Sequence, residues 1–256
     1  MKALILAAGY ATRLRPLTDT WAKELLPVGG RPLIDWILDA VAKVDDVDAV
    51  HVVTNSRKAA GFRAWAAARD EEVAIHDDGT SSNEDRLGAI GDMRFVVDAA
   101  GLDDDLLVIA GDNLFDFDLR DYVAFWRGKG VASAIAVRDV GSKELASLYG
   151  IVEVADDDRV LDFVEKPEDP PTTLAAIATY LYHREHVPLI GRYLDEGNQP
   201  DQPGRFVQWL HRREPVYAWP SAGSWYDVGD LDQLLEADNR LRQLQGLPAR
   251  TAYAPQ

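Results

Sequence analysis

The sequence predicts an α/β protein built on a doubly wound sheet that is mixed but mainly parallel. Strand-like apolar runs alternate with helix-like segments through the first half of the 256 residues, and a β-α-β-α order predicts a parallel sheet. The first run, 4–8, is apolar and uncharged, which is typical of a strand buried on both faces. Ligands bind at the carboxyl ends of such strands, so the residues that follow each strand are the first candidates for function.

Hydrophobic periodicity places the individual elements. In the first half, strands are expected at 2–8, 50–54, 72–76 and 106–110, and helices at 31–43 and roughly 56–69. The second half has more closely spaced strands, expected at 131–137, 150–154, 160–164 and 175–182. Its helices are expected near 185–196, 205–213 and 231–245. The segment 197–204 is predicted to be a loop long enough to act as a mobile element.

The composition limits the kinds of partner. With 43 acidic and 27 basic residues the net charge is −16, which argues against a nucleic-acid surface or an anionic membrane face. A phosphorylated ligand must therefore be bound by local Arg and Lys side chains. The chain has no cysteine, so disulfides and thiolate metal sites are excluded. The first strand begins at once and no run is long enough for a membrane helix, so the expected location is the cytoplasm.

The loop after the first strand carries the strongest functional signal. Gly9 ends the strand, and Thr12, Arg13 and Arg15 follow in a small-residue loop, with Lys23 close behind. Glycine and alanine let the backbone approach a bulky anion, and basic side chains add charge where phosphate oxygens would lie. Neither GxxxxGK[ST] nor GxGxxG is present. The loop therefore indicates a nucleoside triphosphate site of another kind.

This segment resembles the signature of sugar-1-phosphate nucleotidylyltransferases, also called nucleotide-sugar pyrophosphorylases. Their G-x-G-T-R-x-x-P-x-T loop and P-K-x-L-x-P-V element are matched by Gly9, Thr12, Arg13, Pro16, Thr18, Lys23, Leu25, Pro27 and Val28. Ala11 replaces the second glycine and Ala22 replaces the proline before the lysine. Because Ala11 adds a methyl group, the loop is expected to use φ values that alanine tolerates. The resemblance implies a Rossmann-like, glycosyltransferase-A-like fold.

The resemblance also implies which residues bind the nucleotide. It assigns this role to Ala8, Gly9, Thr12, Arg13, Asn83 and Gly88. Arg13 and Lys23 are the expected catalytic residues, with Arg13 on the β- and γ-phosphates and Lys23 near the α-phosphate or the attacking phosphate. Leu87–Met93 resembles an L-G-T-A-G-A-L segment whose backbone reads the nucleobase, and Thr80 or Asn83 in the polar loop before it could add a contact. That backbone suits the edge of thymine or uracil, although a small shift would serve cytosine.

Two aspartates are the candidate metal ligands. Asp112 follows a buried strand, where the family has a metal-binding aspartate. Ser224–Asp230 resembles the family's W-x-D-x-G segment, which makes Asp227 the second ligand. Mg²⁺ prefers one or two carboxylates together with substrate phosphates, which fits this pair. Asp118 and Asp230 are better explained as helix N-caps.

The second half carries motifs that resemble the family's binding elements for the sugar phosphate, the acceptor of the nucleotidyl group. Glu165 and Lys166 match the family's E-K-P element, in which the glutamate contacts sugar hydroxyls and the lysine contacts the sugar phosphate. A G-x-Y strand motif appears with Ala178 in the usual glycine position. The resemblance assigns sugar-phosphate binding to Tyr149, Gly150, Glu165, Lys166 and Tyr180.

Together these elements predict a single domain over 1–256, with a nucleotide-binding half at about 1–130 and a sugar-phosphate-binding half at about 131–246. The resemblance is greatest to glucose-1-phosphate thymidylyl- and uridylyltransferases. It implies magnesium-dependent transfer of a nucleotidyl group from dTTP or UTP to a sugar 1-phosphate such as glucose 1-phosphate, with release of pyrophosphate. One alternative is a cytidylyltransferase for phosphocholine or another non-sugar phosphate, for which an aromatic cage is expected. Another is a catalytically inactive module that binds nucleotide sugars. Monomer and homo-oligomer both remain open.

Overall fold

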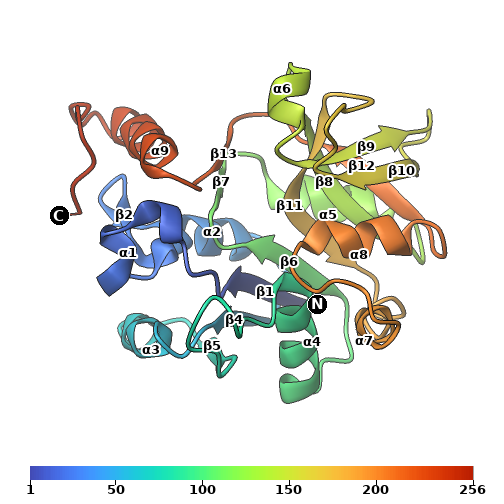
Figure 1. Cartoon of the computed structure of the whole chain (residues 1–256), viewed down its shortest axis with the longest axis horizontal. Helices are drawn as coiled ribbons and strands as arrows, with labels where there is room; N and C mark the ends of the chain where they lie inside the picture. Colours follow the sequence, from blue (N-terminus) through green and yellow to red (C-terminus); the bar gives the residue numbers. More distant parts are fainter. Residues whose placement is uncertain (256) are drawn as a thin grey trace.

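The computed structural model describes residues 1–255, which form an α/β fold around a nine-stranded sheet (Figure 1). The strand order is β10-β9-β11-β6-β1-β4-β5, with β8 paired to β11 and β12 paired to β8. The four strands of the first half are mutually parallel: β1 (Lys2–Ala7), β4 (Ala49–Thr54), β5 (Val73–Asp77) and β6 (Leu106–Ala110). The chain runs from β1 to β4 and β5 on one side and then to β6 on the other. The carboxyl ends of β1 and β6 therefore form the switch point at which such sheets bind ligands.

The second half joins the same sheet through an antiparallel strand. Its strands are β8 (Ser133–Asp139), β9 (Gly150–Val154), β10 (Val160–Glu165), β11 (Leu174–Tyr182) and β12 (Val216–Pro220). β11 runs antiparallel to β6, with Tyr180 opposite Val108. The β11–β8 register shifts between Ala176 and Tyr180, around Ala178 at φ 48°. The fold class predicted from the sequence, a mixed doubly wound sheet, is confirmed.

The longer helices are α2 (Leu33–Val41), α3 (Ala59–Ala67), α4 (Ala89–Ala100), α5 (Leu119–Arg127), α7 (Leu189–Asp195), α8 (Pro203–Leu210) and α9 (Leu231–Leu244). Asp118 accepts a hydrogen bond from the Arg120 amide and Asp230 accepts one from the Gln233 amide, both at 2.9 Å. Both predicted N-caps are therefore confirmed. Helix α4 was not predicted, because its first turn contains Gly91.

Short elements complete the chain: α1 (Leu17–Thr20), α6 (Lys143–Ala146), the 3₁₀ turns η1 (Thr12–Leu14) and η2 (Lys23–Leu25), and the strands β2 (Pro27–Val28), β3 (Arg31–Pro32), β7 (Asn113–Phe115) and β13 (Trp225–Asp227). Residues 31–32 were expected to begin a helix, but they pair with β2 instead. Gly29 and Gly30, at φ 61° and 86°, allow this tight reversal, so the helix begins only after it.

Strand β1 is buried on both faces, as its uncharged run predicts. Ile5 packs with Leu33 and other side chains of one cluster, and Leu4 packs with Ile90 and Met93 of a second cluster on the other face. Alternate side chains thus anchor one helix layer on each side of the sheet. Within residues 1–255, no helix combines the length and apolar character needed to cross a membrane.

Candidate active site

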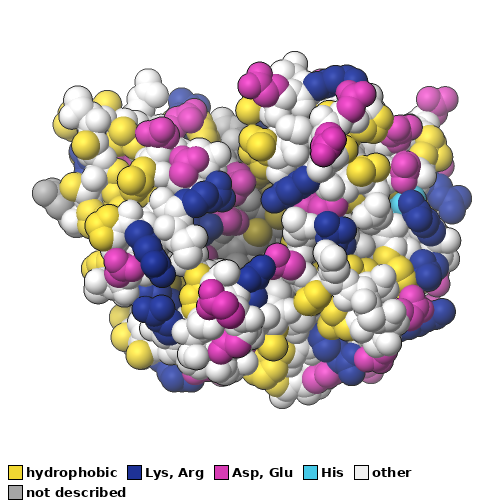
Figure 2. All heavy atoms as spheres, in the orientation of Figure 1, with side chains coloured by type: hydrophobic (Ala, Val, Ile, Leu, Met, Phe, Trp, Pro, Cys, Tyr) yellow, Lys and Arg dark blue, Asp and Glu magenta, His cyan; other side chains and the backbone are white. Residues whose placement is uncertain are grey.

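Figure 2 shows the surface hollowed between the two halves, with basic and acidic side chains around the hollow. Two cavities lie at the carboxyl ends of β1 and β6. We call residues 9–15, which follow β1, the glycine loop, and the cavity beside Gly9 the glycine-loop cavity. This cavity has a volume of about 210 Å³ and is lined by residues that include Ala8, Gly9, Lys23, Gly88 and Asp92. The aromatic cavity, of about 320 Å³, has Tyr149, Glu165, Lys166, Tyr180, Trp225 and Asp227 among its lining residues. Both cavities are lined by Ala110, Asp112, Asp201 and Pro203, so they adjoin one another.

Asp112 and Lys23 form an ion pair where the cavities meet. Lys23 Nζ lies 2.6 Å from Asp112 Oδ2, and the lysine side chain is only 11% exposed. Burial lowers the lysine pKa, but Asp112 and Glu24 raise it more, so the pKa of Lys23 lies above its ordinary value. The lysine therefore stays charged in a partly dehydrated position, and its charge is directed at the place where the two cavities join.

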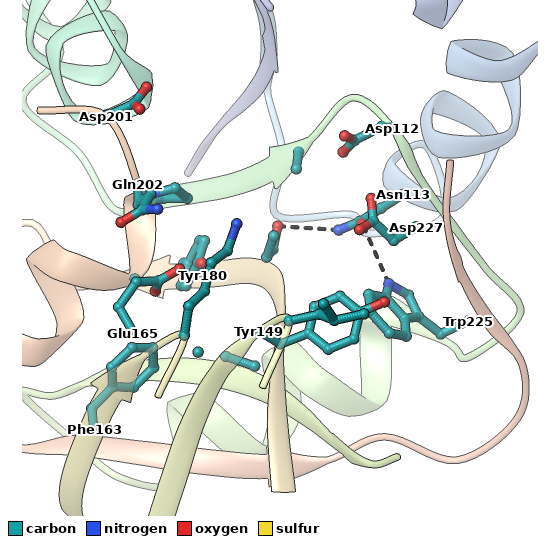
Figure 3. Close-up of a pocket in the computed structure, with 18 residues that line it drawn as sticks. Asp112, Asn113, Tyr149, Phe163, Glu165, Tyr180, Asp201, Gln202, Trp225 and Asp227 are labelled. Atoms are coloured by element: carbon teal, nitrogen blue, oxygen red, sulfur yellow. Dashed lines mark hydrogen bonds between the residues drawn. The ribbon is translucent and has the colours of Figure 1, made fainter. Parts of the chain in front are cut away.

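Asp227 reaches the same place from the far end of the chain. Strands β7 and β13 pair with Asn113 opposite Asp227, and the Val228 amide donates to the Asp112 carbonyl at 3.0 Å. Burial and the nearby Asp112 carboxylate raise the pKa of Asp227 to about 6. In Figure 3, Asp112, Asn113 and Asp227 lie on one side of the aromatic cavity and Glu165 lies on the opposite side. The two aspartates predicted as a pair are thus electrostatic neighbours.

The two carboxylates meet the requirements of a hard divalent cation. Within residues 1–255 no group of three or more His, Cys, Asp and Glu side chains could hold a metal ion alone. Two neighbouring carboxylates, with open cavities beside them, suit an ion that takes its remaining ligands from water and phosphate. The donor set therefore fits the predicted Mg²⁺, provided a phosphate ligand accompanies it.

The glycine loop adopts a backbone conformation that differs from the prediction. Ala11 lies in the left-handed region, at φ 44° and ψ 45°, and not at φ values that alanine adopts easily. Its carbonyl accepts hydrogen bonds from Thr18 Oγ1 at 2.9 Å and from the Leu14 amide at 3.0 Å. These bonds hold the turn against a steric cost of roughly 1–2 kcal/mol. The loop thus adopts a left-handed turn although alanine stands where the family motif has glycine.

The other predicted nucleotide residues divide into two groups. Ala8, Gly9 and Gly88 line the glycine-loop cavity, whereas Thr12, Arg13 and Asn83 are exposed and do not. The Arg13 guanidinium lies against Gly229, where an added Cβ would be 2.8 Å from Nη2. Its charge lowers the pKa of Asp227, so it acts at the carboxylate pair from outside the cavity.

The segment expected to read a nucleobase is held by the loop at 200–201. The Ala89 amide donates to the Asp201 carbonyl at 3.2 Å, and the Ile90 amide donates to the Pro200 carbonyl at 2.8 Å. A Cβ on Gly88, which has φ 79°, would lie 2.7 Å from Asp201 Cα. The amides of Ala89 and Ile90 are therefore not free to bind a nucleobase.

Glycines allow close packing of the residues that were predicted to bind the sugar phosphate. A Cβ on Gly204 would overlap the Glu165 carboxylate and the Phe163 ring, and one on Gly150 would overlap the same ring. Burial raises the pKa of Glu165, although Lys166 and Arg205 partly oppose this effect. The structure therefore places Glu165 and Gly150 together, as the sequence predicts.

Lys166 and the aromatic side chains complete the aromatic cavity. Lys166 is exposed and has φ 48°, and its amide donates to the Tyr149 carbonyl at 3.0 Å. Such strain in a residue other than glycine is often found at functional sites. Trp225 Nε1 donates to Asn113 Oδ1 at 3.2 Å, and its ring centroid lies 5.1 Å from that of Tyr149 (Figure 3). Tyr180 is 3% exposed, so it shapes the wall more than it offers a binding group.

Four acidic residues of the glycine-loop cavity were not predicted: Glu24, Asp78, Asp92 and Asp201. Glu24 is 3% exposed, and burial raises its pKa to about 7. Asp92 is 5% exposed, with its pKa raised to about 8, and it lies beside Asp78. The sequence offered one signal for these residues: Asp92 is an aspartate inside the otherwise small and apolar Leu87–Met93 segment.

A carboxylate pair, a buried lysine and a glycine loop at the switch point of a doubly wound sheet are the features expected of a nucleotide site. The chain belongs to the nucleotidyl transferase family, whose model matches residues 2–243.

Its named relatives include a UTP–glucose-1-phosphate uridylyltransferase of Synechocystis sp., 29% identical over 93% of this chain and 62% of that protein. A glucose-1-phosphate adenylyltransferase of Clostridium novyi is also 29% identical, over 93% of this chain and 66% of that protein. The chain thus spans less than two thirds of the length of these relatives. The solved structure of a UDP-glucose pyrophosphorylase complexed with UDP-glucose shares the fold, with a TM-score of 0.80, 21% identity and coverage of 95% of this chain and 98% of that one.

Proposed function

We propose that the protein transfers a nucleotidyl group from dTTP or UTP to a sugar 1-phosphate such as glucose 1-phosphate, releasing pyrophosphate. One observation carries the proposal: Asp112, paired with Lys23, lines both cavities at their junction. An acceptor in one cavity and a nucleotide in the other would meet beside this pair. The two halves, about 1–130 and 131–246, would then act as one domain.

The nucleotide half would hold the triphosphate. Ala8 and Gly9 offer a wall without bulky side chains, and Arg13 adds a guanidinium near Asp227 that suits the β- and γ-phosphates. Lys23 stands where the α-phosphate must lie if the acceptor enters from the aromatic cavity. Its raised pKa keeps it cationic through the reaction.

The acceptor half would orient the attacking phosphate. Lys166 supplies a cation at the rim of the aromatic cavity, and Glu165 supplies acceptors for sugar hydroxyls inside it. Direct in-line attack of the sugar-phosphate oxygen on the α-phosphorus then needs mainly positioning and charge neutralisation. A divalent cation, expected to be Mg²⁺, would be held by Asp112 and Asp227 and would supply positive charge against the phosphates.

The test is a matrix of substrates. Pyrophosphate release is measured with dTTP, UTP, CTP, GTP and ATP, each against several sugar 1-phosphates and phosphocholine. We expect turnover with a sugar 1-phosphate and a preference for dTTP or UTP. A GTP or ATP preference of about tenfold would refute the pyrimidine assignment and leave the reaction class standing. No pyrophosphate release with any pair would refute the transferase function.

One observation favours the second candidate, transfer to phosphocholine. Tyr149 and Trp225 are partly exposed rings in the aromatic cavity, and a quaternary ammonium binds such faces. The other two rings, Phe163 and Tyr180, are 0% and 3% exposed, so the cage would have only two open walls. We therefore favour the sugar, and the phosphocholine arm of the matrix distinguishes the two.

A further inference from the structure

Asp92 occupies an unusual position in the glycine-loop cavity. It lies in the first turn of α4, is 5% exposed and lines the cavity wall. Its Oδ1 is buried and has no hydrogen-bond partner. In the L-G-T-A-G-A-L pattern that Leu87–Met93 resembles, the position of Asp92 is an alanine. Because Oδ1 has almost no accessible surface, a ligand in the cavity can meet only the other carboxyl oxygen. A carboxyl group buried on a cavity wall costs stability, so its presence there points to a ligand.

Asp78 is the hydrogen-bond partner of the Asp92 carboxyl group. Asp78 accepts hydrogen bonds from the Thr80 amide at 2.7 Å and from Thr80 Oγ1 at 2.8 Å, which hold it as an acceptor. Asp92 donates a hydrogen bond to Asp78, and burial together with the charges of Asp78 and Asp201 raises the pKa of Asp92 to about 8. Asp92 is thus mostly uncharged at neutral pH. With its proton directed at Asp78, the carboxyl oxygen that faces the cavity can accept a hydrogen bond from a ligand.

The backbone amides near Asp92 are already hydrogen-bonded, so a nucleobase in this cavity must be recognised by side chains such as Asp92. The amides of Ala89 and Ile90 donate to the loop at 200–201, and the Gly88 carbonyl accepts from the Asp92 amide at 2.7 Å. We propose that Asp92 selects the nucleobase, its cavity-facing carboxyl oxygen accepting a hydrogen bond from the imide N3–H of uracil or thymine. This inference rests on the proposed function and deepens it. Cytosine presents a lone pair at N3, which would face a lone pair of that carboxyl oxygen and be repelled.

The test measures binding of nucleotides alone, by titration calorimetry with Mg²⁺ and no acceptor. The probes are UTP, N3-methyl-UTP, CTP and GTP. The proteins are the wild type, Asp92→Ala, Asp92→Asn and, as a matched control on the same helix, Asp98→Ala. Asp98 is exposed and paired with Arg94. Thermal melts establish that each variant is folded.

We expect the wild type to bind UTP at least about tenfold more tightly than N3-methyl-UTP or CTP. Asp92→Ala should weaken the binding of UTP by about tenfold and leave the binding of N3-methyl-UTP unchanged, because only UTP loses a hydrogen bond. Asp92→Asn keeps a carbonyl acceptor and an N–H donor toward Asp78, so it should bind UTP like the wild type. Asp98→Ala should leave the binding affinity for both ligands unchanged.

Equal losses for UTP and N3-methyl-UTP in Asp92→Ala would overturn the inference, as would unchanged UTP binding or tighter binding of GTP than of UTP. If Asp92→Ala fails to fold, weak UTP binding by Asp92→Asn would overturn it instead. The binding assay does not depend on turnover, so the two claims can fail separately. If the proteins show the expected binding pattern but the wild type releases no pyrophosphate with any substrate pair, the proposed function is refuted and this inference stands.

Discussion

Replacing Asp92 by asparagine should change how stability depends on pH. In the folded protein the pKa of Asp92 is raised to about 8, whereas its ordinary value is 3.8. Between these values the folded state binds one proton more than the unfolded state, so stability falls as pH rises. The slope is about 1.4 kcal/mol for each pH unit. Asparagine resembles the protonated acid and has no proton to lose, so this contribution to the slope disappears.

From about pH 5 to pH 7, the free energy of unfolding of Asp92→Asn should therefore rise by about 2.7 kcal/mol relative to the wild type. The assay is urea denaturation of both proteins at a series of pH values, with Asp98→Asn as the surface control. Glu24 titrates in the same range, but it does so in both proteins and cancels from the difference. Parallel stability curves for wild type and Asp92→Asn would refute the reasoning, because they would mean that Asp92 is already ionised when folded.

Three further outcomes are expected. Asp112→Asn and Asp227→Asn should each lower metal-dependent pyrophosphate release by orders of magnitude without unfolding the protein, and near wild-type turnover in both would contradict the metal assignment. Lys166→Ala should raise KM for the acceptor by about tenfold or more, whereas the exposed Lys143→Ala should not; equal KM values in the two variants would exclude the phosphate role. Ala11→Gly should raise the free energy of unfolding by about 1 kcal/mol in urea denaturation, by relieving the left-handed backbone, and a decrease would show that the turn is unstrained.

Much of the fold was predictable because local patterns and global packing agree. The run 4–8 is apolar on both faces of its strand, and the structure buries both faces in separate clusters. The N-caps at Asp118 and Asp230 were predictable for the same reason, since a short acidic side chain before a helix has one dominant use. Helix α4 escaped prediction because Gly91 weakens the helical signal, and it is tertiary contact with the loop at 200–201 that fixes its start.

The site was predictable in its residue types and less so in its geometry. Motifs identified Asp112 and Asp227, but only the fold shows that Lys23 neutralises the first of them. Ala11 gave no sign of a left-handed backbone, because hydrogen bonds from residues farther along the chain impose that conformation. Asp92 was overlooked because its unusual state depends on burial and on Asp78, neither of which a linear sequence displays.

The pairing of β7 with β13 has a consequence for biosynthesis. Trp225 bonds to Asn113 across 112 positions of sequence, and Asp227 lies on the same short ribbon. Contacts between such distant segments close late, because the chain must first order everything between them. A nascent chain that has emerged only as far as β12 would contain the glycine loop, Lys23 and Asp112, yet lack the second carboxylate. The predicted metal site, which needs both carboxylates, would thus be incomplete until nearly the whole described chain has been synthesised.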